Sequence, residues 1–206
     1  AYKNMVGAFH MPKLVYTNIS TLKTLTDVQF SSGMGEIIKH GLIKDAAYYD
    51  WLGEHWQEIN ERDLSVCEEM VLISNRIKRD VVETDPTEQG ERALLNYGPI
   101  EKLADFKLMH GHCVGLGCIA AMGISAARGA LPEEALTNLK ERMERFHMPL
   151  TVSGLSAEDI IETTKSDKKM DSGTIRFVLL EEVGKAYLDR TVTDEEMNAG
   201  LSRILA

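Results

Sequence analysis

The sequence predicts a mainly α-helical protein that carries one small β-hairpin. In several long segments, apolar residues recur at steps of three and four, which is the period of a helix with one buried face. Only one pair of short segments has the two-residue alternation of adjacent strands. Because the sequence has no βαβ rhythm, internal repeat or GxGxxG motif, it does not predict a nucleotide-binding sheet.

Two helices are predicted in the first half of the chain. Residues 31–45 contain the run E-I-I-K-H, in which Glu36, Lys39 and His40 fall at i, i+3 and i+4 and share one helical face. Residues 64–82 have a single apolar stripe, formed by Val66, Met70, Ile73, Ile77 and Val81. This spacing predicts a helix that buries one face.

Three more helices are predicted from their ends. One has Pro132 in its first turn and stops before Pro149, with apolar residues at Leu136, Leu139, Met143 and Phe146. The next starts at Ser156, which with Asp159 resembles a capping box, and runs towards Lys165. The last begins near Thr193 and Asp194 and carries Met197, Leu201 and Ile204.

Small residues dominate a further helical segment, residues 113–127, with Gly115, Gly117, Ala120, Ala121, Gly123, Ala126 and Ala127. Their thin side chains let another backbone or a ligand approach closely. Two compatible interpretations follow, namely close helix packing and a helix that lies beneath a site.

Strand signals are few. Residues 174–180 alternate at Ile175, Phe177 and Leu179, and residues 185–188 can return as the hairpin partner across Gly184. A shorter apolar run, residues 13–16, predicts a weaker strand.

Composition narrows the class of protein. A chain of 206 residues with 44% hydrophobic residues can bury a core as one domain or two small ones. Its 32 acidic and 23 basic residues leave a net charge of −9, which would repel a polyphosphate backbone and argues against nucleic acid as a partner. We expect a cytoplasmic protein.

The cysteines and the apolar runs add two expectations. Cys67, Cys113 and Cys118 are an odd number without a CxxC pair, so we expect reduced, buried thiols rather than disulfides or a zinc knot. The low-charge run at residues 113–127 is shorter than the roughly 18 to 20 apolar residues of a membrane span, and no signal peptide is recognised, so no membrane partner is expected.

Several groups of residues could carry chemistry. Glu36 and His40 have the spacing of a two-ligand metal pair, although the same spacing is common in solvated acid and base pairs. In residues 78–98, Lys78 ends a helix, and Arg92 and Asn96 share a face of the next one. A phosphorylated or polyhydroxylated ligand would suit this set, and surface salt bridges are the alternative.

Two histidines and two lysines complete the candidates. His110 and His112 flank a glycine and would point to opposite sides of a regular helix, so at most one belongs to a given site unless the helix begins between them. Lys168 and Lys169 precede the predicted hairpin, where one of them could reach an anionic substrate or both could simply be solvated.

The order of five motifs is more informative than any one of them. They are K-N-M-V-G-A-F-x-x-P from residue 3, G-M-x-E-I-I-K-x-G-L-I from 33, K-x-x-V-V-x-x-D-x-x-E-x-G-x-R-x-x-L-N-x-G from 78, L-x-H-G from 108 and D-K-K-x-x-x-G-x-x-R-F-V-L-L from 167. Together they resemble the 3-dehydroquinate synthase family over nearly the whole chain. The resemblance is to the multi-helical C-terminal domain, with residues 1–30 as a connection from an NAD-binding domain and residues 31–206 as the metal- and substrate-binding domain.

This resemblance implies an enzyme of the shikimate pathway. The family uses NAD and a divalent metal, commonly zinc or cobalt, to convert 3-deoxy-D-arabino-heptulosonate 7-phosphate into 3-dehydroquinate and phosphate. The metal acts as a Lewis acid on the hydroxyl that is oxidised. Homodimers are common in the family, and this chain alone is expected to be inactive.

The resemblance also implies roles for individual residues. Glu36 and His110 match metal ligands, and Glu88 matches a carboxylate that transfers protons. Lys39 and Lys78 match catalytic lysines that hold substrate oxygens. The remaining positions match substrate contacts: Lys3, Asn4, Arg92, Asn96 and Lys168.

One motif breaks this pattern. The family continues L-N-x-G with H-T-x-x-H-x-x-E, which supplies a metal-ligand histidine and a catalytic histidine, whereas here Gly98 is followed directly by Pro99, Ile100 and Glu101. About five residues are absent if Glu101 closes the motif. His112 also stands where the family usually has Glu. Glu36 and His110 alone are too few for the usual three-ligand catalytic site.

Four interpretations stay open. Either the histidine loop has been lost and the site is degenerate, or the sequence omits residues of a longer protein. If the site is intact, another sugar-phosphate cyclase of the same superfamily is the alternative enzyme. A non-catalytic helical domain, kept for binding or oligomerisation, is the alternative outside catalysis.

Overall fold

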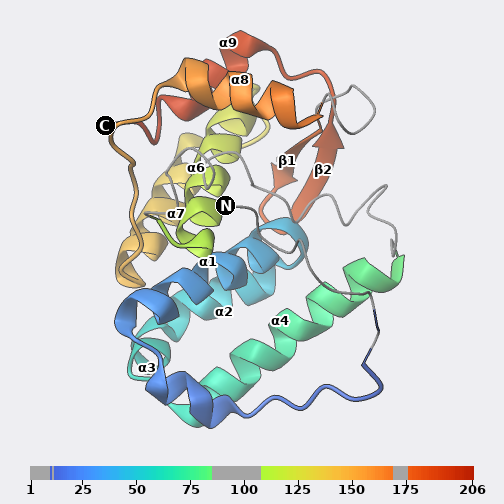
Figure 1. Cartoon of the computed structure of the whole chain (residues 1–206), viewed down its shortest axis with the longest axis vertical. Helices are drawn as coiled ribbons and strands as arrows, with labels where there is room; N and C mark the ends of the chain where they lie inside the picture. The colour runs from blue at the N-terminus through green and yellow to red at the C-terminus, as the bar shows by residue number, and fades with distance from the viewer. Residues whose placement is uncertain (1–9, 11, 85–107, 169–175) are drawn as a thin grey trace.

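The computed structural model of the chain describes residues 10, 12–84, 108–168 and 176–206, and it is a helical assembly with one hairpin (Figure 1). A short 3-10 helix, η1 (Ile19–Thr24), precedes α1 (Asp27–Lys44). The remaining elements, in chain order, are α2 (Ala46–Glu54), α3 (Trp56–Asn60), α4 (Leu64–Thr84), α6 (His110–Ala127), α7 (Glu133–Arg145), α8 (Ala157–Lys168), β1 (Phe177–Glu182), β2 (Lys185–Asp189) and α9 (Asp194–Leu201).

Helix α6 is the central element of the fold. It is buried along nearly its whole length, and it packs against α1, α7, α9 and strand β1 (Figure 1). By length and composition α6 is apolar enough to cross a membrane, but 83% of this stretch is buried inside the described part of the fold, as in a core helix. The expectation of close packing is therefore confirmed for the buried small residues of this segment, Gly115, Gly117, Ala121 and Gly123, whereas Ala127 at its end is exposed.

The predicted helices are confirmed, with differences at their ends. Pro132 is the N-cap of α7 rather than a first-turn residue, because its ψ of 147° is extended. Ser156 Oγ accepts the backbone N–H of Asp159 at 3.1 Å, as an N-cap side chain does at the start of α8. Thr193 and Glu196 form a complete capping box on α9, which ends at Leu201, before Ile204.

The buried face of α4 differs from the predicted apolar stripe. Its buried residues include Cys67, Met70, Ser74 and Val81, whereas Ile73 and Ile77 are half-buried. The buried face of α4 is therefore rotated by about one residue from the predicted stripe. This rotation places the hydroxyl of Ser74 in the core beside α1.

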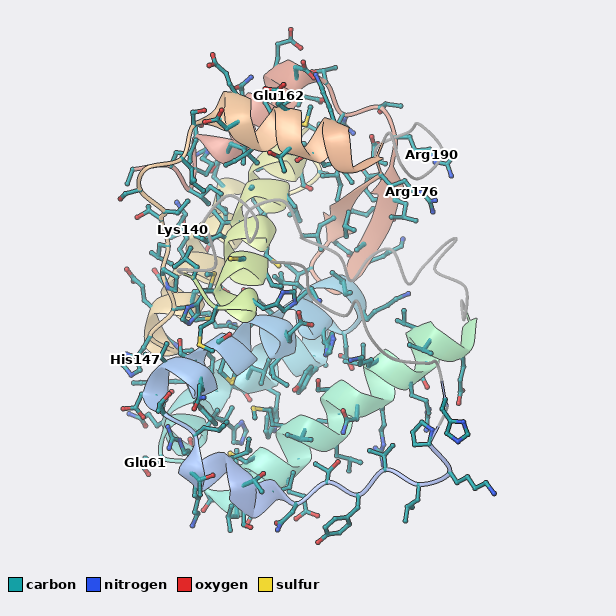
Figure 2. The ribbon with its side chains drawn as sticks, viewed as in Figure 1. Glu61, Lys140, His147, Glu162, Arg176 and Arg190 are labelled. Carbon is teal, nitrogen blue, oxygen red and sulfur yellow. The ribbon has the colours of Figure 1, made fainter. Side chains whose placement is uncertain are left out.

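The predicted hairpin is confirmed as an antiparallel pair in which Val178 lies opposite Leu188. Its burial does not alternate, because Val178 and Leu180 pack into the main core and Leu179 packs against Ala121 and Ile124. Both faces of β1 are thus covered. Arg176 and Arg190 mark its open end (Figure 2).

The hairpin turn reaches the corner between α1 and α2. Gly184 has a φ of +87°, which favours glycine, and its N–H donates to the carbonyl of Leu42 at 2.8 Å. A Cβ at this position would lie 2.9 Å from the Cβ of Ala46, so the turn and the start of α2 fit closely.

The strand predicted at residues 13–16 is wrong. This segment forms no strand, and Leu14 is 84% exposed, with Val15 and Tyr16 also exposed. A strand needs a neighbour to pair with, and the described residues offer none here. The expectation about the cysteines is confirmed, since all three are buried thiols that form no disulfide.

Candidate active site at the crossing of α1 and α6

The candidate site lies where α1 and α6 cross with their backbones in contact. A Cβ at Gly35 would lie 2.7 Å from the carbonyl carbon of Gly111, and a Cβ at Gly111 would lie 2.6 Å from the carbonyl carbon of Ser32. The N–H of Gly111 donates to Ser32 Oγ at 3.1 Å. Because neither position leaves room for a side chain, the glycines set the separation of the two helices.

This crossing brings together residues that are far apart in the chain. Glu36 follows Gly35 on α1, and His110 precedes Gly111 at the start of α6. Their side chains meet, with Glu36 Oε1 3.2 Å from His110 Nε2. Glu36 is 34% exposed and His110 is 57% exposed, so the pair faces solvent.

The second oxygen of the Glu36 carboxylate accepts a hydrogen bond from a buried lysine. Lys39 is only 1% exposed, and its Nζ donates to Glu36 Oε2 at 2.7 Å. A buried ammonium needs a counter-charge, and Glu36 supplies one. Burial would raise the pKa of the Glu36 carboxyl, but the charge and hydrogen bond of Lys39, aided by His40 and His110, hold the pKa below its ordinary value.

His40 lies beneath this pair and connects it to α4. It is 4% exposed, its Nδ1 is 2.8 Å from Ser74 Oγ, and its Nε2 is 3.9 Å from Glu36 Oε2. Burial, with the charges of Lys39 and Lys78, lowers the pKa of His40 to about 4 against the opposing effect of Glu36. The ring is therefore neutral at neutral pH.

His112 has a different neighbourhood, as its spacing from His110 predicts. Its Nε2 is 3.2 Å from Ser31 Oγ, and that hydroxyl donates to the carbonyl of His147, at the corner where α7 ends (Figure 2). Because the single hydroxyl hydrogen is used on His147, Ser31 accepts from His112. Burial lowers the pKa of His112, so this ring is a neutral packing residue.

Comparison with known proteins assigns the family. Residues 33–170 match the family described as 3-dehydroquinate synthase C-terminal. This stretch includes α1, α4, α6 and α7, and therefore the whole crossing. The chain belongs to the 3-dehydroquinate synthase family.

Individual relatives agree with this assignment. The 3-dehydroquinate synthase of Halalkalibacterium halodurans is 40% identical over 204 residues, which cover 95% of this chain and 55% of the relative. That of Ruegeria sp. (strain TM1040) is 34% identical over 216 residues, covering 99% and 58%. The chain thus spans a little over half the length of the curated 3-dehydroquinate synthases it matches.

Solved structures share the fold. ValA, the 2-epi-5-epi-valiolone synthase of Streptomyces hygroscopicus subsp. jinggangensis 5008, with NAD+ and Zn2+ bound, has a TM-score of 0.87 at 23% identity and covers 97% of this chain and 57% of its own. A 2-deoxy-scyllo-inosose synthase complexed with carbaglucose-6-phosphate, NAD+ and Co2+ has a TM-score of 0.77 at 20% identity, covering 98% and 59%. These likenesses confirm the helical fold of the 3-dehydroquinate synthase C-terminal family.

The structure describes the positions of only some of the predicted site residues. It brings Glu36, Lys39 and His110 together. Lys78 does not end its helix as predicted, because α4 continues to Thr84; it lies one turn after Ser74, exposed and close enough for its charge to act on His40. The other predicted residues lie outside the described part of the chain, namely Lys3, Asn4, Glu88, Arg92 and Asn96. Lys168 ends α8, but its side chain is also outside the described part.

The Glu36 and His110 pair fits part of the metal site expected for a 3-dehydroquinate synthase. Oxygen and nitrogen atoms 3.2 Å apart can bind one divalent cation as neighbours. Within residues 12–84, 108–168 and 176–206, however, no three His, Cys, Asp or Glu side chains form a group that could hold a metal. A catalytic cation would need a further ligand.

Sequence reasoning missed Ser74. A lone serine inside an apolar helical stripe gives little signal, but Ser74 stands four residues before Lys78 and so shares its face. That spacing, next to a candidate lysine, is the pattern that could have identified it.

Proposed function

We propose that this chain is the C-terminal part of an NAD- and metal-dependent 3-dehydroquinate synthase, a carbon–oxygen lyase. The reaction would convert 3-deoxy-D-arabino-heptulosonate 7-phosphate into 3-dehydroquinate and phosphate, on the route to chorismate and aromatic amino acids. The observation that carries this proposal is the likeness to curated 3-dehydroquinate synthases over 95% or more of the chain in several cases. Glu36, Lys39 and His110, meeting at one crossing, support it.

The proposal assigns a role to each of the three residues that meet at the crossing. Glu36 and His110 would hold the divalent metal, zinc or cobalt, which when bound would polarise the hydroxyl being oxidised. The ammonium of Lys39 would exchange its hydrogen bond to Glu36 for one to a substrate oxygen, and the exposed Lys78 would attract the anionic substrate. Glu88 would transfer protons, and the other predicted residues, Lys3, Asn4, Arg92, Asn96 and Lys168, would bind substrate.

We propose further that NAD binds in the part of the relatives that this chain does not span. The chain alone would then lack turnover. We also propose that the whole protein acts in the cytoplasm as a homodimer on a small sugar phosphate, without nucleic acid or membrane as a partner.

Product analysis tests the reaction. The whole protein is incubated with NAD, Co2+ and either 3-deoxy-D-arabino-heptulosonate 7-phosphate or sedoheptulose 7-phosphate, and the products are identified by mass spectrometry. Dehydroquinate from the first substrate supports the proposal. A cyclic product from the second substrate only would identify another sugar-phosphate cyclase, and no turnover of either would favour a non-catalytic domain.

Lys78→Ala tests the proposed substrate site. Loss of one charge-assisted contact to an anionic substrate should lower kcat/KM by about 10- to 100-fold. The helical circular dichroism should not change, because Lys78 is exposed. Arg79→Ala is the matched control, since Arg79 is its exposed neighbour and pairs with Asp80. Equal activities of the two variants would refute the role of Lys78.

A further inference from the structure

His40 is a buried side chain to which the proposed function gives no role. It lies on α1 one turn after Glu36 and is 4% exposed. Its Nδ1 is bound to Ser74 Oγ at 2.8 Å, whereas its Nε2 is buried without a hydrogen-bond partner among the described residues. The charged atom it faces is Glu36 Oε2, at 3.9 Å.

The acceptors around Ser74 and His40 favour one position for the hydrogen of the neutral ring. The carbonyl of Met70 accepts the Tyr48 hydroxyl at 2.7 Å and, inside a regular helix, the N–H of the residue four positions later, Ser74. Both lone pairs of that carbonyl are then used. The Met70 carbonyl is thus closed to the Ser74 hydroxyl, and Nε2 faces an acceptor, Glu36 Oε2, rather than a donor. Both observations favour the tautomer in which Ser74 donates to His40 Nδ1 and the neutral ring carries its hydrogen on Nε2.

That hydrogen points toward the carboxylate of Glu36. An unpaired buried donor costs free energy, so a nearby acceptor that can move will be drawn to it. Glu36 is partly exposed and can move, and a shift of about 1 Å would bring Oε2 from 3.9 Å to ordinary hydrogen-bond length. Oε2 could still accept from Lys39, because a carboxylate oxygen has two lone pairs.

We propose that His40, oriented by Ser74, is a positioning residue that donates through Nε2 to Glu36 Oε2 and so directs Oε1 toward His110 and a shared divalent cation. The role of the cation rests on the proposed function. Outer partners that hydrogen-bond a ligating carboxylate commonly fix its orientation, and their loss weakens metal binding by about 10- to 100-fold. In this chain the partner would be on the same helix as its ligand.

Two substitutions of His40 by amide side chains distinguish the roles of its two ring nitrogens. The longer side chain of His40→Gln can reach the place of Nε2 and keeps a donor for Glu36. The shorter side chain of His40→Asn keeps a partner only for Ser74. Tyr49→Phe is the control, because it removes another hydrogen bond, the 3.1 Å bond to Asn138, without touching Glu36, Ser74 or the Met70 carbonyl.

Co2+ binding to the purified chain, followed by calorimetry and visible absorption, provides the first readout. We expect His40→Asn to weaken Co2+ binding about 10-fold or more, and His40→Gln and Tyr49→Phe to stay within about threefold of the wild type. Wild-type affinity in His40→Asn, or equal losses in the Gln and Asn variants, would overturn the proposal.

A second readout works without metal. Urea unfolding of His40→Asn, Glu36→Gln and the double variant measures whether the two side chains interact. Coupling of at least about threefold in the unfolding constant supports the contact, and additive effects refute it. If the wild type does not bind Co2+ but the coupling is present, the metal part of the proposed function fails while the contact stands. Ser74→Ala replaces His40→Asn in the cycle if the latter does not fold.

Discussion

Replacing Gly35 with alanine tests whether the contact of two backbones controls the candidate site. The new Cβ would lie 2.7 Å from the carbonyl carbon of Gly111, whereas carbon atoms in contact are about 3.5 Å apart or more. The obstacle is backbone, so no rotamer change can relieve it. The two helices must therefore separate by about 1 Å at this point.

The cost of Gly35→Ala follows from three effects. Overpacking costs about 1–3 kcal/mol, and loss of the buried bond from Gly111 to Ser32 costs about 1 kcal/mol. The better helix propensity of alanine returns about 1 kcal/mol. We therefore expect the free energy of unfolding to fall by about 1–3 kcal/mol, and Tm to fall by about 2–4 °C for each kcal/mol.

Gly33→Ala is the matched control on the same helix. A Cβ at Gly33 meets nothing within 4 Å, so this variant should be as stable as the wild type or up to about 1 kcal/mol more stable. Urea unfolding at neutral pH compares the variants, and Co2+ calorimetry compares their metal affinities. If Gly35→Ala matches Gly33→Ala in both measurements, the glycine contact does not set the site.

Three further outcomes follow from the described contacts. Burial lowers the pKa of His40 from 6.5 to about 4, so the unfolded chain binds a proton at this site at a higher pH than the folded chain does, and His40 should reduce the free energy of unfolding by about 3 kcal/mol as the pH falls from 6.5 to 4. Urea unfolding at each pH should show that the His40→Gln variant lacks this contribution, and identical pH profiles of stability for the variant and the wild type would contradict it. Gly184→Ala should lower the free energy of unfolding by about 1–3 kcal/mol more than Gly154→Ala, because both positions have positive φ but only Gly184 has a close neighbour, Ala46. Equal melting temperatures of the two variants would show that the hairpin turn does not depend on this contact. Glu36→Gln should abolish Co2+ binding while the helical circular dichroism is kept, and unchanged calorimetry would remove Glu36 from the metal site.

Local features were predictable from the sequence because they depend on neighbouring residues. The capping box of Thr193 and Glu196 and the turn at Gly184 each involve residues a few positions apart. The strand expected at residues 13–16 failed for the opposite reason. A strand depends on a partner elsewhere in the chain, and the pattern of one segment contains no information about that partner.

The site was predictable as a set of residues but not as a geometry. The family motifs identified Glu36, Lys39 and His110, and the structure supplied the fact that they meet. Their meeting depends on two glycines in different helices, and each glycine alone indicates only a place that another backbone could approach. Ser74 was missed because its role appears only once α4 is packed beside α1.

The crossing of α1 and α6 also has a consequence for how the protein folds. Its two glycines bury no side chains against each other, so the contact brings little hydrophobic gain until both helices are in place. A long stretch of chain must first be closed into a loop, which has an entropic cost. The pairing of Glu36 with His110 should therefore be among the late events of folding. A nascent or partly unfolded chain would then present these two candidate ligands separately, and a divalent cation, if bound by both, would stabilise only the completed fold.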